Sequence, residues 1–128
     1  MSPLLAARPA SDIVVVGPCA SGKSTLVEGL RLHGIRARQI AQEHSYVPAM
    51  WQILARPRFL VYLQASHAAC TARKQLDWTP REYQEQIDRL AHARQHCDLL
   101  VDTELLTPEQ VLAAVLKGLD HAGIRGTV

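Results

Sequence analysis

The hydrophobic residues of this chain gather in short segments that alternate with stretches of more widely spaced apolar positions. Short segments rich in β-branched and other apolar residues predict four strands, over residues 12–16, 35–41, 58–64 and 98–102. Their weak polar alternation is typical of a parallel sheet, whose strands are covered on both faces. Elsewhere apolar residues recur at helical spacing, which predicts helices over residues 23–33, 47–55, 66–76, 79–97 and 107–119.

Residues typical of helix ends support these assignments. Thr79 and Thr107 are each followed by a proline, and Glu82 and Gln110 lie three positions after the two threonines. This pattern predicts a capping box, in which the threonine hydroxyl and the Glu or Gln side chain satisfy the first amides of the helix. Gly34 stands where a glycine ends a helix.

The alternation of strands and helices predicts an α/β fold. Connections between parallel strands are right-handed, and with this constraint the simplest sheet order is second, first, third and fourth strand. We therefore expect a three-layer α/β/α architecture with a parallel four-stranded sheet of order 2-1-3-4. Residues 1–128 are expected to form one domain, in which residues 1–10 and 121–128 are loose tails.

The amino-acid composition argues against several classes of partner but does not identify a ligand. The 128 residues include 14 Lys and Arg against 12 Asp and Glu, a near-balance that argues against a concentrated basic face and a nucleic-acid partner. Three widely spaced cysteines without a CxxC pair favour neither a disulfide framework nor a zinc site, and indicate a reducing cytoplasm. Since no apolar run approaches about 18 residues, no membrane partner is expected.

One segment carries specific chemistry. The residues "GPCASGKS" fit the pattern G-x-x-x-x-G-K-[ST] between a predicted strand and a predicted helix. Such a loop turns successive amides toward phosphate oxygens, and the following helix directs its positive end at the same point. A chance match in a glycine-containing turn is the alternative, and the strand and helix around the loop argue against it. The residues expected to bind nucleotide are Gly17, Pro18, Cys19, Ala20, Ser21, Gly22, Lys23, Ser24 and Thr25.

The loop and two later stretches resemble the P-loop NTPases, and among them the small nucleoside, nucleotide and small-molecule kinases. The later stretches are "RFLVYLQASHAACTARKQ" and "CDLLVDTELLTPEQVLAAVL". The resemblance implies ATP or GTP as ligand with Mg²⁺ as cofactor. Lys23 would reach the β- and γ-phosphates and the Ser24 hydroxyl would bind the metal. The chain is shorter than such kinases, and its third strand ends in Gln64 where an Asp is common.

A phosphoryl-transfer site also needs an acid and an arginine. In the predicted sheet order the second strand lies beside the loop strand and leads into Glu43 and His44, so Glu43 is the candidate for orienting the metal's water or the attacking group. Arg73 stands where the resemblance puts an arginine that acts on the nucleotide, with Lys74 beside it. Solvated side chains on a loop and on a helix surface are the alternatives for these residues.

Three functions are compatible with these features. The leading hypothesis is transfer of the γ-phosphoryl group of ATP or GTP to a small molecule, with Lys23, Glu43 and Arg73 as catalytic residues. A nucleotide-binding module without transferase activity and a simple nucleoside-triphosphate hydrolase are the alternatives. The sequence leaves open the acceptor, the base preference and a homo-oligomeric state.

Overall fold

The structure, a computed structural model, describes residues 12–126. The sheet contains β1 (Ile13–Val16), β2 (Ala37–Gln39), β3 (Phe59–Gln64) and β4 (Leu99–Asp102). The helices are α2 (Lys23–Leu32), the short 3₁₀ helix η1 (Gln42–His44), α3 (Met50–Ala55), α4 (His67–Lys74), α5 (Pro80–His96) and α6 (Pro108–His121). The tail expected over residues 1–10 lies outside the described residues.

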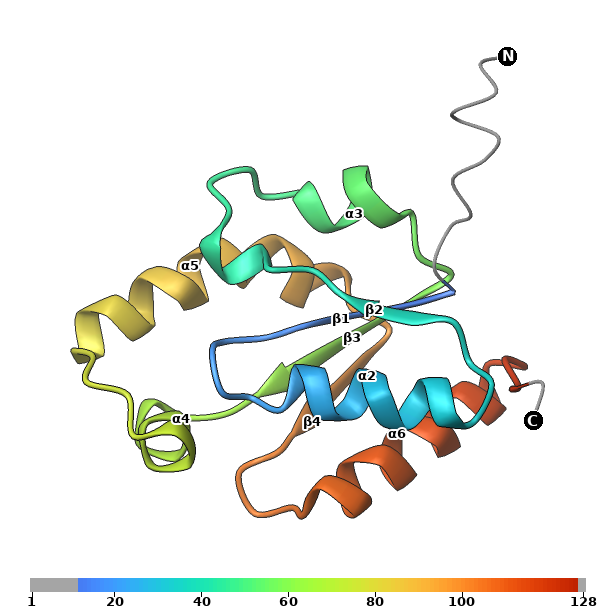
Figure 1. Ribbon diagram of the computed structural model, residues 1–128. Helices are drawn as coiled ribbons and strands as arrows, with labels where there is room; N and C mark the ends of the chain where they lie inside the picture. The colour runs from blue at the N-terminus through green and yellow to red at the C-terminus, as the bar shows by residue number, and fades with distance from the viewer. Residues whose placement is uncertain (1–11, 127–128) are drawn as a thin grey trace.

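The sheet has the order β2-β1-β3-β4, and every neighbouring pair of strands is parallel. The predicted α/β fold and strand order are therefore confirmed. Figure 1 shows α2 and α6 on one face of the sheet and α3 and α5 on the other. Because β1 is central, the loop that follows it opens at the carboxyl edge, where ligands bind in sheets of this kind.

Alternate side chains of each strand serve two separate cores. Ile13 and Val15 pack with Leu26, Leu30 and other residues of α2 and α6. Val14 and Val16 face the opposite way. That second core contains Trp51 of α3, Leu60 and Tyr62 of β3, and Leu90 and Ala93 of α5. Burial on both faces explains why these strands are apolar throughout.

Several boundaries differ from the sequence prediction. β2 is only three residues long, because it pairs with β1 alone and two of its three residues are exposed. Residues 42–44 form η1, which no periodicity predicted, and α3 begins at Met50 rather than at residue 47.

The chain end also differs from the expected tail. Helix α6 continues to His121, and Ile124 beyond it is buried, with its amide donating to the Leu119 carbonyl at 2.9 Å. Residues 121–126 are therefore attached to the first core, so the loose tail that the sequence analysis expected over residues 121–128 is wrong for this part of it. Residues 127 and 128 lie outside the described residues.

The predicted helix ends are confirmed. Thr79 and Thr107 each accept a hydrogen bond from the backbone of Glu82 and Gln110, whose side chains bond back to the threonine amides. Gly34 adopts a φ of 73° just after α2, a conformation that favours glycine. Within residues 12–126, no helix is both long enough and apolar enough to cross a membrane.

The packing of α2 makes a testable prediction. Leu30 is fully buried in the first core, whereas Leu32 on the same helix is 74% exposed. We expect Leu30→Ala to lower the free energy of unfolding by about 2–5 kcal/mol, because it leaves a cavity in the core. Leu32→Ala is the matched control and should change it by less than about 0.5 kcal/mol. Equal urea midpoints for the two variants would contradict this packing.

Candidate functional site

The loop between β1 and α2 approaches β3 closely. A Cβ atom on Gly17 would lie 2.6 Å from the Leu63 carbonyl oxygen and 2.7 Å from Ser21 Oγ, so only glycine fits there. The chain then turns through left-handed conformations at Ala20 (φ 65°) and Gly22 (φ 101°) before α2 begins. The loop is thus tight against the sheet at its start and open at the first turn of the helix.

Lys23 is almost fully buried beneath this loop, with 7% of its surface exposed. Its ammonium group donates to the carbonyls of Gly17 at 2.8 Å and Pro18 at 3.0 Å. A third bond, of 2.8 Å, reaches Glu43 Oε2. All three donors of the ammonium are therefore used, and the lysine ties the two ends of the loop to η1.

Glu43 occupies the place that the predicted topology gave it, beside the loop at the end of β2. It is only 4% exposed, and its second oxygen, Oε1, is buried without a hydrogen-bond partner among residues 12–126. A buried carboxylate oxygen without a donor is costly, because it has lost its water. The geometry therefore leaves one Glu43 oxygen available to a ligand.

The position of η1 is fixed by side chains that the sequence analysis did not single out. Gln42 is fully buried, and its amide donates to the Val47 and Arg89 carbonyls while its oxygen accepts from the Trp51 amide. Arg89 of α5 in turn donates to the Glu43 carbonyl at 3.2 Å. These bonds fix the orientation in which Glu43 meets the loop.

Gln86 of α5 is a second residue that sequence reasoning missed. It is 7% exposed, accepts from the Cys19 amide at 3.0 Å, and donates through Nε2 to Cys19 Sγ at 3.2 Å. On the same side of the loop, His44 Nε2 lies 3.4 Å from Cys19 Sγ. The Cys19 position is thus held by α5 and η1 together.

Arg73 reaches the loop from α4. Its guanidinium donates to Thr103 Oγ1 at 2.9 Å, to the Thr103 carbonyl at 2.5 Å and to the Ala20 carbonyl at 3.4 Å. Thr103, 2% exposed, donates in turn to the Ser21 carbonyl at 3.3 Å. Thr103 lies in the stretch "CDLLVDTELLTPEQVLAAVL", but the sequence analysis did not single it out, because its bonds join segments that are far apart in the chain.

Ser24 and Thr25 lie at the start of α2 and face the same space. Ser24 Oγ accepts a hydrogen bond of 2.7 Å from Gln39 Nε2 at the end of β2. The serine hydroxyl and the Glu43 carboxylate are oxygen ligands of the kind that Mg²⁺ prefers, so the residues present fit this ion.

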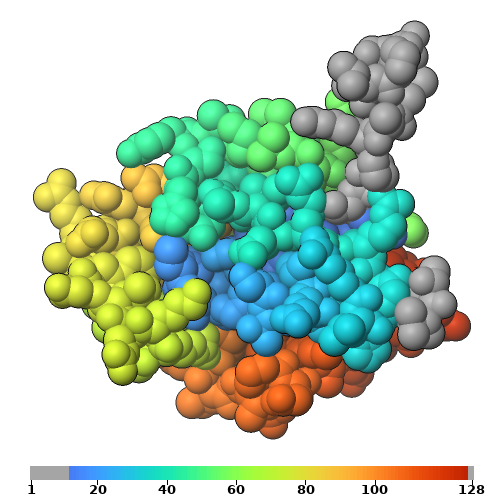
Figure 2. All heavy atoms as spheres, viewed as in Figure 1, coloured from blue at the N-terminus to red at the C-terminus, as the bar shows by residue number. Residues whose placement is uncertain are grey.

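A pocket of about 600 Å³ unites these groups. Figure 2 shows the loop and α2 in blue, surrounded on this face by the segments of η1–α3, α4–α5 and α6. Its lining includes residues of the loop and polar side chains around it, Cys19, Ala20, Ser21, Gly22, Lys23, Ser24, Thr25, Gln39, Glu43, Arg73, Lys74 and Thr103, and the apolar residues Leu26, Leu76, Leu106, Pro108 and Val111. Gly17 and Pro18 do not line it and contribute carbonyl oxygens to Lys23 instead.

Cys70 lies close behind this site but differs from Cys19 in its environment. It is fully buried in α4, and burial raises the pKa of its thiol, although Arg73 opposes that shift. A thiol with a raised pKa stays protonated at neutral pH and is a poor nucleophile or metal ligand. Cys70 is therefore a core residue.

Comparison with known proteins adds no assignment: no family model and no curated protein matches this chain.

The Lys23–Glu43 pair makes a prediction about stability. We expect Lys23→Met to lower the free energy of unfolding by about 3–5 kcal/mol, because it leaves a buried carboxylate unpaired. Adding Glu43→Gln should recover part of that loss, which denaturant titration of both variants would measure. Arg81→Met is the control: this exposed arginine lies 3.6 Å from Glu85, and its loss should cost less than about 0.5 kcal/mol. A double variant as unstable as the sum of the single variants would refute the coupling.

Proposed function

We propose that this protein is a P-loop NTPase of kinase-like build, which binds Mg·ATP or Mg·GTP and transfers the γ-phosphoryl group to a small molecule. The observation that carries the proposal concerns two buried atoms. Within residues 12–126, the buried side-chain oxygens that lack a partner are Ser21 Oγ and Glu43 Oε1, and both residues line the loop pocket. Buried polar atoms are normally satisfied, so this pair favours a polar ligand there.

The loop supplies the phosphate-binding groups. The first amides of α2 have no partner inside the helix and carry its positive end, which favours an anion at this point. Lys23 already lies among the carbonyls of the loop, and phosphate oxygens could take the place of these acceptors. Ser24 would ligate Mg²⁺ directly, with Glu43 holding one of its waters, and the ion would neutralise the charge of the triphosphate.

The apolar part of the pocket lining suits a nucleobase. Leu76, Leu106, Pro108 and Val111 provide apolar walls from segments that follow α4 and β4. A volume of about 600 Å³ is in the range of pockets for nucleotide-sized ligands. The combination of polar and apolar lining residues thus matches the phosphates and the base of a nucleoside triphosphate.

Arg73 is the candidate for stabilising the transferring phosphoryl group. Its guanidinium borders the same pocket and is oriented by Thr103. A fixed cation at this place would act on charge that develops on the phosphoryl oxygens, and it would need little reorganisation to do so.

A nucleotide-binding or hydrolytic module is the second candidate. What favours it is that one oxygen of Glu43 is bound to Lys23 and the Cys19 amide is bound to Gln86, so part of the polar machinery is already paired. A module of this kind would bind nucleotide, or hydrolyse it slowly, without a phosphoryl acceptor. For either function we propose the cytoplasm as compartment, since Cys19, Cys70 and Cys97 are all free thiols.

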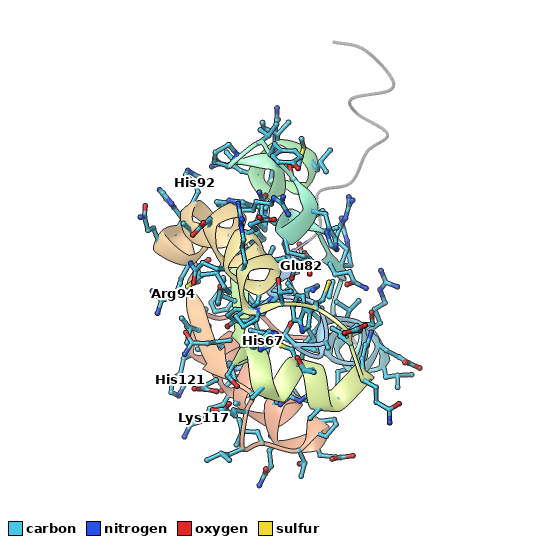
Figure 3. All side chains as sticks on the ribbon, turned by 90° about the vertical axis from the view of Figure 1, so that its left-hand side faces the viewer. His67, Glu82, His92, Arg94, Lys117 and His121 are labelled. Carbon is cyan, nitrogen blue, oxygen red and sulfur yellow. The ribbon has the colours of Figure 1, made fainter. Side chains whose placement is uncertain are left out.

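Binding tests the phosphate site. We expect Mg·ATP or Mg·GTP to bind the wild type, and Lys23→Ala to weaken that binding about tenfold or more, because a charged phosphate contact is lost. Lys117→Ala is the control, since Lys117 is an exposed lysine on α6, labelled in Figure 3. Titration calorimetry measures both. Equal affinities for the two variants, or no binding of either nucleotide to the wild type, would exclude the phosphate site.

Turnover measurements distinguish a phosphotransferase from a nucleotide-binding module. With a panel of nucleosides and sugar-like alcohols, we expect one class of acceptor to accelerate the release of nucleoside diphosphate. Arg73→Ala should then lower kcat about 10²–10³-fold, as for other donors that stabilise a developing oxyanion. Glu43→Gln should also lower kcat, whereas Arg81→Ala should leave it unchanged. Nucleotide binding that no acceptor turns into transfer would favour the binding module.

A further inference from the structure

Three side chains of different chemistry converge beside the loop. Cys19 Sγ, His44 Nε2 and a carboxylate oxygen of Glu43 all lie within 4.8 Å of one another. Two of them come from η1 and the third from the loop. A thiol, an imidazole and a carboxylate together form a donor set typical of zinc.

The separations fit one metal ion. With a Zn–S bond of about 2.3 Å and a Zn–N bond of about 2.0 Å at a tetrahedral angle, sulfur and nitrogen lie about 3.5 Å apart. Cys19 Sγ and His44 Nε2 are 3.4 Å apart. Glu43 Oε2, the oxygen that is bonded to Lys23, lies 4.0 Å from His44 Nε2, so the carboxylate group is close to the imidazole. All three ligand atoms lie within 4.8 Å of one another, so side-chain shifts of about 1 Å would bring them to the separations of a tetrahedral site.

Glu43 gives a second and independent indication of a ligand. Its side chain is 95% buried, and Oε1 has no hydrogen-bond partner among residues 12–126, whereas Oε2 is bonded to Lys23. A carboxylate of this kind can keep its lysine with one oxygen and bind a cation with the other. A Cys19 thiolate and the Glu43 carboxylate would offset most of the charge of Zn²⁺ and Lys23, and the carbonyls of Gly17 and Pro18 also stabilise the lysine.

The surroundings support the sulfur ligand. Gln86 Nε2 donates to Cys19 Sγ at 3.2 Å, which is how an outer amide orients and stabilises a metal-bound thiolate. The His44 side chain is 58% exposed, so an ion could enter from solvent. Three protein ligands leave the fourth position of a tetrahedral ion to water.

We propose that Cys19, Glu43 and His44 form a Zn²⁺-binding site beside the glycine loop. The spacing of the cysteines had argued against zinc, because only Cys19 among them contributes and the other ligands come from a separate segment. The site does not rest on the proposed nucleotide function, since its ligands are assembled without a nucleotide.

Co²⁺ is the probe, used with the full chain in the reduced form and without nucleotide. We expect one Co²⁺ per chain, with a thiolate-to-cobalt charge-transfer band in the near ultraviolet and visible bands of tetrahedral strength, all removed by Zn²⁺. Cys19→Ser should abolish the charge-transfer band. His44→Gln should weaken Zn²⁺ binding about tenfold or more.

Matched controls lie elsewhere on the molecule. Cys97→Ser removes another partly buried cysteine, and His121→Gln removes an exposed histidine on α6, labelled in Figure 3. Both variants should keep the cobalt spectrum of the wild type. Circular dichroism verifies that Cys19→Ser and His44→Gln remain folded.

Three outcomes would overturn the proposal: no charge-transfer band in the wild type, a band that survives Cys19→Ser, or unchanged Zn²⁺ affinity in His44→Gln. Each would leave an ordinary hydrogen bond as the explanation of the short contact between Cys19 and His44. Failure of the nucleotide proposal is recognised separately, because that titration uses Mg²⁺ and nucleotide without cobalt or zinc.

Discussion

The buried ammonium group of Lys23 is the interaction on which the rest of the site depends. A charge taken out of water costs several kcal/mol unless it is paired and fully hydrogen-bonded. Lys23 meets that requirement with two loop carbonyls and Glu43. One side chain thereby fixes the curvature of the loop, the start of α2 and the position of η1. The edge strand β2 is short and leads directly into η1, which carries Glu43 to the Lys23 ammonium group.

Helix α5 is the outer support of this arrangement. Gln86 accepts a hydrogen bond from the Cys19 amide and donates one to the Cys19 sulfur. Arg89 donates to the Glu43 carbonyl, and its own carbonyl accepts from the Gln42 side chain. The capping box at Thr79 fixes where this helix begins, and therefore which turn faces the loop. The capping box at the start of α5 thus determines that Gln86, nearly two turns later, faces Cys19.

The loop is consequently surrounded by two chemically different sets of donors. Ser24, Lys23 and Arg73 offer an oxygen donor and cations to the pocket. Cys19, which also lines the pocket, and His44 offer sulfur and imidazole. Glu43 belongs to both sets, because its two oxygens are distinct in their partners. In the two proposals taken together, a ligand bound by one set alters the electrostatic environment of the other.

By itself the sequence determined the fold class, the order of the strands, both capping boxes and the glycine loop, because each depends on local spacing or on a general rule of chain connection. It also predicted that Glu43 lies beside the loop, because the strand before Glu43 neighbours the loop strand in the predicted sheet order. Only the tertiary structure revealed Gln86, Thr103 and the Lys23–Glu43 bond. Gln86 lies 67 positions from Cys19, and Thr103 lies 82 positions from Ser21. Hydrogen bonds between residues so far apart in the chain form only when helices and strand ends pack together. They therefore produce no periodic pattern in the sequence.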